Sequence, residues 1–245
     1  MFNFDHKTEK AILNIKTKIF ADGADLNSMI ELNKLSYIKG LTTNPSLMRK
    51  AGIDNYEKFA KSVLQNVKEK SVSFEVFSDN HDEMYIQAKK ISSWGNNAFA
   101  KIPICNTKKQ YSYDLIKKLS DENVKLNITA IMTKDQIDGV YNSLNKDTES
   151  FVSIFAGRIA DTGVDPESII TYAVDINENF NSEIIWASTR EVLNIFQCAK
   201  LGCDIITVTP ELIGKLKNLG KNLEEYSIDT VKMFYNDAKS AGYEI

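Results

Sequence analysis

Eight short apolar runs recur along the chain, each about as long as a β-strand. They are rich in Ile, Val, Phe and Thr, which is typical of parallel strands buried on both faces. The runs are KIFADGA (18–24), IKGLTTN (38–44), VSFEVF (72–77), AFAKIPI (98–104), KLNITAIM (125–132), SFVSIFAG (150–157), EIIWAST (183–189) and CDIITVT (203–209). Longer segments with helical spacing separate them; in 83–94, for example, Met84, Ala88 and Ile91 share one face.

Several of these intervening segments carry helix boundary signals. Thr133 is followed three residues later by Gln136, which predicts a capping box. Asp165 suits an N-cap and Pro166 the first helical turn. The C-terminal segment reads as a long helix that ends at Gly242. Strands and helices therefore alternate along the chain.

Eight βα units in 245 residues predict an α/β fold, a single (β/α)8 TIM barrel with an extra N-terminal helix and a C-terminal closing helix. No linker-like stretch interrupts the alternation, so we expect one domain spanning 1–245. An open, doubly wound sheet is the alternative, because periodicity does not show whether a sheet closes. The closing helix could cover its own barrel or dock on a second copy, which would make a homo-oligomer.

Composition narrows the choice of partners and compartment. The formal net charge is −3, and lysines are mixed with acids, so we expect no nucleic-acid partner. No segment is apolar enough for a signal peptide or a membrane span, so we expect a cytoplasmic protein without a membrane partner. Cys105, Cys198 and Cys203 lack CxxC spacing and read as reduced thiols. With only His6 and His81, a His-rich metal centre or a Ser–His relay is poorly supported.

Lys101 stands inside the apolar run AFAKIPIC (98–105). An ammonium buried without a partner costs several kcal/mol, so a buried lysine tends to become a neutral amine. A neutral amine attacks carbonyl carbons and forms a Schiff base. The plainer interpretation is a lysine that reaches solvent at the strand end or pairs with a carboxylate.

Polar side chains interrupt the other apolar runs as well. In a barrel, chemistry lies at the C-terminal ends of the strands. Each such residue has an ordinary explanation, for instance Asn44 as a turn residue before Pro45 or Asp22 as a helix cap. One polar group on most strands, together with an isolated lysine, instead predicts a reaction pocket. The residues are Asp22, Asn44, Glu75, Lys101, Asn127, Thr129, Ser153 and Ser188.

These segments resemble the transaldolase family, which comprises Schiff-base enzymes on a (β/α)8 barrel. The resemblance covers nearly the whole chain. It rests on FADGAD (20–25), GLTTNPSL (40–47), SFEV (73–76), AKIP (100–103), LNITAIM (126–132), SIFAGRIAD (153–161), WASTR (186–190) and GCDIITVTP (202–210), in the family's order. The TTNPS signature is the most specific of them.

The resemblance implies a role for each site residue. Lys101 becomes the Schiff-base nucleophile, and Asp22 the acid/base that takes the proton of the substrate hydroxyl. Glu75 and Thr129 would hold a catalytic water. Asn44, Asn127 and Ser153 would orient the dihydroxyacetone hydroxyls, while Arg158, Ser188 and Arg190 would bind the phosphate. No cofactor or metal is expected, because the lysine activates the carbonyl. Surface ion pairing is the ordinary alternative for both arginines.

The resemblance also separates two activities. The fructose-6-phosphate aldolase branch has glutamine in place of Glu75 and tyrosine in place of Phe155, so these residues favour a transaldolase of the pentose phosphate pathway. Its substrates would be sedoheptulose 7-phosphate or fructose 6-phosphate and an aldose phosphate. An aldolase, or a specialised ketol transferase of another sugar pathway, is the alternative. An inactive sugar-phosphate-binding barrel is a third, although a binding protein has no need of a buried amine.

Overall fold

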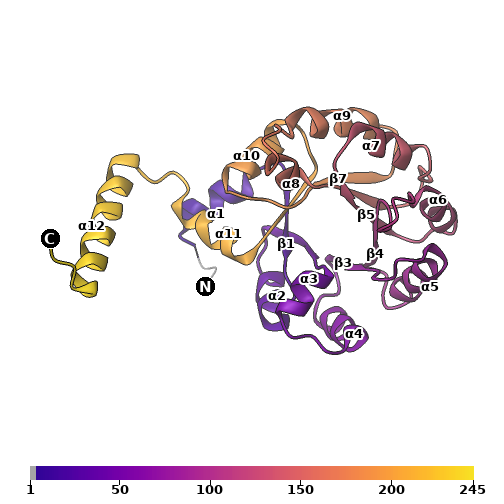
Figure 1. Ribbon diagram of the computed structural model, residues 1–245, viewed down its shortest axis with the longest axis horizontal. Helices are drawn as coiled ribbons and strands as arrows, with labels where there is room; N and C mark the ends of the chain where they lie inside the picture. The colour runs from indigo at the N-terminus through magenta and orange to yellow at the C-terminus, as the bar shows by residue number, and fades with distance from the viewer. Residues whose placement is uncertain (1–3) are drawn as a thin grey trace.

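Eight parallel strands form a closed barrel in chain order in the computed structural model, which describes residues 4–245 (Figure 1). β1 pairs with both β2 and β8, which excludes the open doubly wound sheet and confirms the (β/α)8 prediction. The strands are β1 (Lys18–Asp22), β2 (Ile38–Thr42), β3 (Ser71–Glu75), β4 (Ala98–Pro103), β5 (Leu126–Ile131), β6 (Ser150–Ile154), β7 (Ser182–Trp186) and β8 (Ile205–Val208). Each lies within a predicted run or starts one residue before it.

Helices surround the barrel on its outside, except the C-terminal helix α12 (Leu223–Ala241), which stands apart from it (Figure 1). They are α1 (His6–Leu13), α2 (Leu26–Asn33), α3 (Pro45–Lys50), α4 (Tyr56–Asn66), α5 (His81–Ser92), α6 (Tyr113–Asp121), α7 (Lys134–Tyr141), α8 (Ala156–Ala160), α9 (Glu167–Asn177), α10 (Leu193–Lys200), α11 (Pro210–Lys215), η1 (Leu216–Asn218) and α12 (Leu223–Ala241). Helix α1 is the predicted extra N-terminal helix. None of these described helices is both long enough and apolar enough to cross a membrane.

The predicted helix boundaries are correct to within one residue. The capping box of α7 forms, since Gln136 N donates to Thr133 Oγ1 and the Gln136 side chain accepts from the Thr133 backbone. At α9 the N-cap is Pro166 rather than the predicted Asp165. The Asp165 carboxylate nevertheless accepts a hydrogen bond from Glu167 N at 2.9 Å, so it still satisfies a free N–H of the first turn.

Three phenylalanines fill the interior of the barrel. The rings of Phe99 and Phe151 stack with their centroids 4.2 Å apart, and Phe20 meets Phe151 edge-on at 5.5 Å. Gly40 on β2 makes room for this packing, because a Cβ there would lie 2.5 Å from the Phe20 ring. Together with Ile185 and Ile205 on β7 and β8, these rings form a separate apolar cluster inside the strands. We call this cluster the aromatic floor.

Helix α12 does not close the barrel of its own chain. It ends at Gly242 as predicted, with that residue in the left-handed conformation. None of its residues is buried, and in Figure 1 it stands apart from the barrel at the end of the linker that follows η1. The amphipathic pattern that predicts this helix is therefore present, but its apolar side chains have no partner within the described chain.

Candidate active site

The polar side chains at the strand ends lie one step above the aromatic floor. Alternate residues of a strand share a face, so Asp22 follows Phe20 into the barrel interior, and Lys101 follows Phe99. The same two-residue step leads from Gly40 to Thr42, from Phe151 to Ser153 and from Ile205 to Thr207. The site is therefore the top layer of the barrel interior, supported from below by apolar packing.

Lys101 is buried, with a side chain only 8% exposed. Its Nζ lies 3.1 Å from Oε2 of Glu75, the residue opposite it on the neighbouring strand β3. Nζ also lies 3.4 Å from the backbone oxygen of Thr43. The lysine therefore pairs with a carboxylate, as the plainer interpretation expects, and that carboxylate belongs to a predicted catalytic residue. The structure thus places the amine beside a group that can accept its proton.

Asp22 lies opposite Thr42 on β2 and accepts a hydrogen bond from Thr42 Oγ1 at 2.9 Å. Burial raises the pKa of the Asp22 carboxyl, and the nearby Glu75 carboxylate raises it further. The Lys101 ammonium and the Thr42 hydrogen bond act in the opposite direction but do not cancel the effect of burial. A raised carboxyl pKa suits a group that must take up a proton and return it near neutral pH.

A hydrogen-bonded row crosses β3, β5 and β6. Ser153 Oγ donates to Asn127 Oδ1 at 2.7 Å, and Asn127 Nδ2 donates to Ser73 Oγ at 2.9 Å. This row fixes the amide of Asn127, which is the neighbour of Lys101 on the adjoining strand. The Thr129 hydroxyl, in contrast, is buried and has no protein hydrogen-bond partner among the described residues. A buried hydroxyl of this kind needs a water or a ligand as its partner.

Irregular backbone positions two of the predicted phosphate-binding residues, Arg158 and Ser188. Ser188, two residues after β7, has a positive φ of 64°, which is uncommon for a residue other than glycine. Gly157 lies against it, since a Cβ at position 157 would be 1.6 Å from the Ser188 carbonyl oxygen. The glycine therefore lets α8 approach the end of β7. This contact brings Arg158 and Ser188 to the same cavity wall.

The two predicted phosphate-binding arginines differ in the structure. Arg158 lines the cavity, whereas Arg190 is not among its described lining residues. Arg190 instead forms a bidentate ion pair with Asp161, with Nε to Oδ1 at 3.0 Å and Nη2 to Oδ2 at 2.5 Å. The Arg190 guanidinium lowers the pKa of the Asp161 carboxyl, and Asp161 raises the pKa of Arg190. The plainer interpretation, a surface ion pair, therefore describes Arg190 as it stands here.

All the other predicted site residues meet in one cavity of about 440 Å3. The cavity is lined by Asp22, Thr42, Asn44, Pro45, Ser46, Leu47, Glu75, Lys101, Asn127, Thr129, Ser153, Phe155, Arg158, Ala187, Ser188 and Thr207. Asn44 has a second role, because its Oδ1 caps α3 through Leu47 N at 3.0 Å. Among the described residues, no group of three or more His, Cys, Asp or Glu side chains could hold a metal ion.

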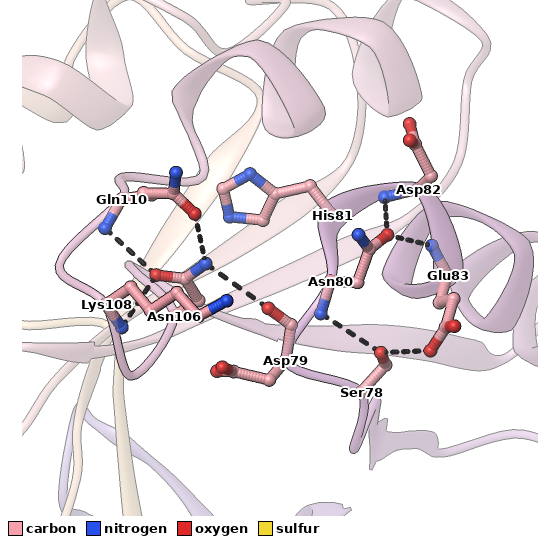
Figure 2. A pocket seen from close by; sticks show the side chains of 9 residues that line it. All are labelled: Ser78, Asp79, Asn80, His81, Asp82, Glu83, Asn106, Lys108 and Gln110. Carbon is pink, nitrogen blue, oxygen red and sulfur yellow. Dashed lines mark hydrogen bonds between the residues drawn. The ribbon is translucent and has the colours of Figure 1, made fainter.

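Figure 2 shows a second cavity of about 360 Å3, formed by the loops that follow β3 and β4. Its polar groups largely bond one another. Asn106 Nδ2 donates to Gln110 Oε1 at 2.7 Å, and Asn80 Oδ1 accepts from the backbone N–H groups of Asp82 and Glu83. No predicted catalytic residue lines this cavity. Its hydrogen bonds account for the shape of the two loops, and we assign the chemistry to the first cavity.

Sequence reasoning missed three hydroxyls of the site, those of Thr42, Ser73 and Thr207. Threonine is a good strand former, so a hydroxyl inside a strand gives little warning of a polar role. A signal was available, however. Each of these residues falls on the same alternating face as a predicted site residue or a floor residue, and counting in steps of two from Gly40, Glu75 or Ile205 would have found them.

Comparison with known proteins identifies the family. The family model described as transaldolase/fructose-6-phosphate aldolase matches residues 19–245. The chain belongs to this family. A probable transaldolase of Sulfurihydrogenibium sp. (strain YO3AOP1) is 34% identical over 203 residues, covering 81% of this chain and 88% of that protein. A probable transaldolase of Ruegeria sp. (strain TM1040) is 31% identical over 233 residues, covering 93% of this chain and 99% of that protein.

Solved structures with low sequence identity share the fold. A dihydrodipicolinate synthase from Rhodopseudomonas palustris superposes with a TM-score of 0.57 at 13% identity, covering 91% of this chain and 79% of that chain. A putative lyase/mutase from Burkholderia cenocepacia J2315 superposes with a TM-score of 0.57 at 10% identity, covering 97% of this chain and 88% of that chain. At such identities the likeness concerns the barrel alone, and the family assignment rests on the sequence matches.

Proposed function

We propose that this enzyme of the transaldolase/aldolase type is a transaldolase. It transfers a dihydroxyacetone unit from a ketose phosphate, sedoheptulose 7-phosphate or fructose 6-phosphate, to an aldose phosphate through a Schiff base on Lys101. The observation that carries the proposal is the buried Lys101 Nζ, 3.1 Å from the Glu75 carboxylate in the cavity that Asp22 also lines. A pathway of sugar phosphates such as the pentose phosphate pathway, in the cytoplasm, is the setting that fits these substrates.

The first step is attack of Lys101 on the ketose carbonyl. An ammonium must lose a proton before its nitrogen can attack, and Glu75 is the nearest carboxylate to accept it. The resulting carbinolamine loses its oxygen as water, which requires a proton to be returned to that oxygen. The unpartnered Thr129 hydroxyl and Glu75 are suited to hold the water that carries this proton. The lysine supplies the activation of the carbonyl, so the proposed reaction requires no cofactor.

The second step breaks the carbon–carbon bond. A base removes the proton of the hydroxyl beside that bond, and the oxygen forms the carbonyl of an aldose phosphate that leaves. The electron pair of the broken carbon–carbon bond is taken up by the iminium, which becomes an enamine. Asp22 is the proposed base, because it is a cavity carboxyl with a raised pKa and lies close enough to Lys101 for their charges to interact. The Asn127–Ser153 row and Asn44 would orient the hydroxyls of the bound three-carbon unit.

Whether the three-carbon unit is transferred to an aldose phosphate or released as dihydroxyacetone then depends on the lifetime of the enamine. Phe155 lines the cavity and packs against the aromatic floor, so its ring is suited to exclude water from the enamine. Glu75 also favours a transaldolase over the aldolase branch. A fructose-6-phosphate aldolase or a specialised ketol transferase is the second candidate, favoured only by the small size of the chain. An inactive sugar-phosphate-binding barrel would leave the Lys101–Glu75 pair without a purpose.

Two measurements on one preparation test this proposal. Borohydride treatment with fructose 6-phosphate should leave a stable adduct on the peptide that contains Lys101, as read by mass spectrometry. The same enzyme should transfer the three-carbon unit to erythrose 4-phosphate faster than it releases free dihydroxyacetone. Faster release would favour the aldolase alternative, and absence of any adduct would favour the inactive binding barrel.

The two arginines should contribute unequally to phosphate binding. Arg158 faces the cavity, whereas Arg190 must exchange Asp161 for a phosphate. Arg158→Ala should therefore raise KM for fructose 6-phosphate by about tenfold or more, the scale of a lost charged hydrogen bond, with little effect on unphosphorylated dihydroxyacetone. Arg190→Ala should have a smaller effect. Steady-state kinetics with both donors tests this prediction. Equal losses of kcat/KM for both donors would mean that the arginines have only a structural role.

We also propose that the chain forms a homo-oligomer through α12. Val231, Phe234 and Tyr235 are each more than 60% exposed on this helix, although burial of such side chains is favourable. Residues 223–245 hold five acidic side chains and two lysines, which disfavours direct pairing of two α12 helices. A second copy offers an apolar surface on its barrel instead, where Leu193 and Phe196 are exposed one turn apart on α10.

Light scattering coupled to size exclusion tests the role of α12. The full chain should be larger than the 27.7 kDa monomer, and Phe234→Asp should reduce its mass toward that value. A matched control is Lys232→Ala, which removes a charged side chain from the same helix. Helicity measured by circular dichroism should stay unchanged in both variants. A full chain that is monomeric at micromolar concentration would contradict this proposal.

A further inference from the structure

Two threonine hydroxyls on the strands that flank β1 form a hydrogen-bonded row that ends at Asp22. Thr42 Oγ1 lies 2.9 Å from Asp22 Oδ1 and 2.6 Å from Thr207 Oγ1. The three residues sit on β1, β2 and β8, and β1 pairs with both of the other strands. Thr42 is 3% exposed and Thr207 is 7% exposed, and both line the cavity.

The direction of these hydrogen bonds follows from the number of protons. An ionised carboxylate has no proton to donate, so Thr42 must donate its single hydroxyl proton to Asp22. Thr42 then has only an acceptor lone pair for its neighbour, so Thr207 must be the donor in the 2.6 Å contact. The chain therefore runs from Thr207 to Thr42 to Asp22. Without Thr207, the Thr42 hydroxyl would be free to rotate away from the carboxylate.

This arrangement differs from that of two other buried threonines beside the barrel strands. Thr17 and Thr189 each donate to a backbone oxygen, of Cys203 and Thr207 respectively, which is the ordinary way to satisfy a hydroxyl between strands. Thr42 and Thr207 instead bond each other and a carboxylate. Valine would fill the same space without burying a polar group, so packing alone does not require hydroxyls at 42 and 207.

We infer that Thr42 and Thr207 are positioning residues: Thr42 holds Asp22 in the orientation needed for proton transfer, and Thr207 acts only by fixing the Thr42 hydroxyl. The role in catalysis rests on the proposed function, in which Asp22 is the base. The hydrogen-bonded chain itself does not depend on that function. The two parts can therefore be tested separately.

The hydrogen-bonded row of Thr207, Thr42 and Asp22 should also influence the pKa of the Asp22 carboxyl. The other charged groups of the cavity are Lys101, Glu75 and Arg158. Burial raises the Asp22 pKa more than Lys101 and the Thr42 hydrogen bond lower it, and Glu75 raises it further. The Thr42 hydrogen bond lowers this pKa because it favours the ionised form. Removing the hydroxyl should therefore raise the Asp22 pKa further. Because Asp22 must be ionised to act as a base, the acid limb of the activity profile should then move to higher pH.

The direct test is a carbon-13 NMR titration of the Asp22 carboxyl in the unliganded protein, assigned with Asp22→Asn. Thr42→Val should raise the Asp22 pKa, and Thr207→Val should raise it less. The double variant should match Thr42→Val alone, because Thr207 has no other route to Asp22. Thr42→Ser and Thr207→Ser should restore the wild-type titration. Thr42→Ala replaces Thr42→Val if the latter melts at a much lower temperature.

Kinetics then tests the catalytic part. Thr42→Val should lower kcat at neutral pH by about tenfold or more, the scale of a lost hydrogen bond to a charged group, while the borohydride adduct at Lys101 still forms. The matched control is Thr17→Val, which removes an equally buried hydroxyl at the opposite end of β1 and should leave the pH profile unchanged.

Each failure has its own signature. An unchanged Asp22 titration in Thr42→Val would overturn the hydrogen-bonded chain. An additive effect in the double variant would overturn the assignment of Thr207 as acting through Thr42. A shifted titration with unchanged kcat would overturn the positioning role. A wild-type protein that forms no adduct would contradict the proposed function. The titration would still decide whether the Thr207–Thr42–Asp22 hydrogen bonds are present.

Discussion

Lys101→Arg should abolish both the borohydride-trapped adduct and cleavage of the ketose. A guanidinium stays protonated and cannot attack a carbonyl carbon. Removal of a covalent nucleophile can cost about 10⁶-fold in kcat in other enzymes, so we expect activity to fall below about one ten-thousandth of the wild-type value. Intact-mass analysis after borohydride treatment, together with a coupled transfer assay, measures both effects.

Two further variants make this test specific. Lys101→Met removes the charge at similar length and controls for the larger size of arginine beside Glu75. Lys18→Arg is the matched control, because Lys18 also lies on a barrel strand and pairs with a carboxylate, Glu183, at 2.5 Å, but at the opposite end of the barrel. Lys18→Arg should keep full activity. An adduct that persists on another lysine in Lys101→Arg would contradict the assignment.

The fold could be predicted because its signal is local and repeated. A strand buried on both faces is mostly apolar, so each of the eight strands is visible as a run such as the one from Lys18 or from Ile38. Closure of the sheet into a barrel could not be predicted from the sequence pattern. It depends on hydrogen bonds between β1 and β8, residues nearly two hundred positions apart, and no local pattern reports such a contact.

Several polar residues of the candidate site could be picked out from the sequence because they are unusual in their strands. An ionisable residue in an apolar strand, such as Lys101 or Asp22, stands out against its neighbours. A threonine in a strand does not, so the Thr42–Thr207 pair could not be recognised before the register of β1, β2 and β8 was known. The distance of 3.1 Å between Lys101 and Glu75 likewise follows from register, since the two residues face each other across β3 and β4.

The partners of surface residues are harder to predict from the sequence, because an exposed side chain has several partners within reach. A long arginine side chain can turn toward any of them, and the sequence gives no reason for Arg190 to bond Asp161 rather than face the cavity. Helix α12 raises the same problem at a larger scale. Its amphipathic pattern predicts that an apolar face will be covered, but says nothing about which surface covers it.

Asp22→Asn should separate chemistry from imine formation. The amide cannot accept the proton of the substrate hydroxyl, so turnover should fall by about 10²–10⁴-fold, the usual contribution of a general base. Lys101 and Glu75 are untouched, so the borohydride adduct should still form. Asp25→Asn is the matched control, three residues further along, where the side chain only caps α2 through Ser28 N at 2.7 Å. It should remain fully active.

The same variant should become more stable as its activity is lost. The Asp22 pKa is raised in the folded protein by burial, so ionisation of this carboxyl favours the unfolded state. Below the unfolded-state pKa, near 3.9, Asp22 is protonated in both states and contributes no pH-dependent difference. As pH rises from there through the folded-state pKa, the wild-type protein loses stability that the variant retains, because an amide does not ionise. The melting-temperature advantage of Asp22→Asn should therefore grow with pH until Asp22 is ionised in the folded wild-type protein. A variant that is inactive and also less stable at neutral pH would mean that Asp22 supports the fold, and its role as the base would have to be reassigned.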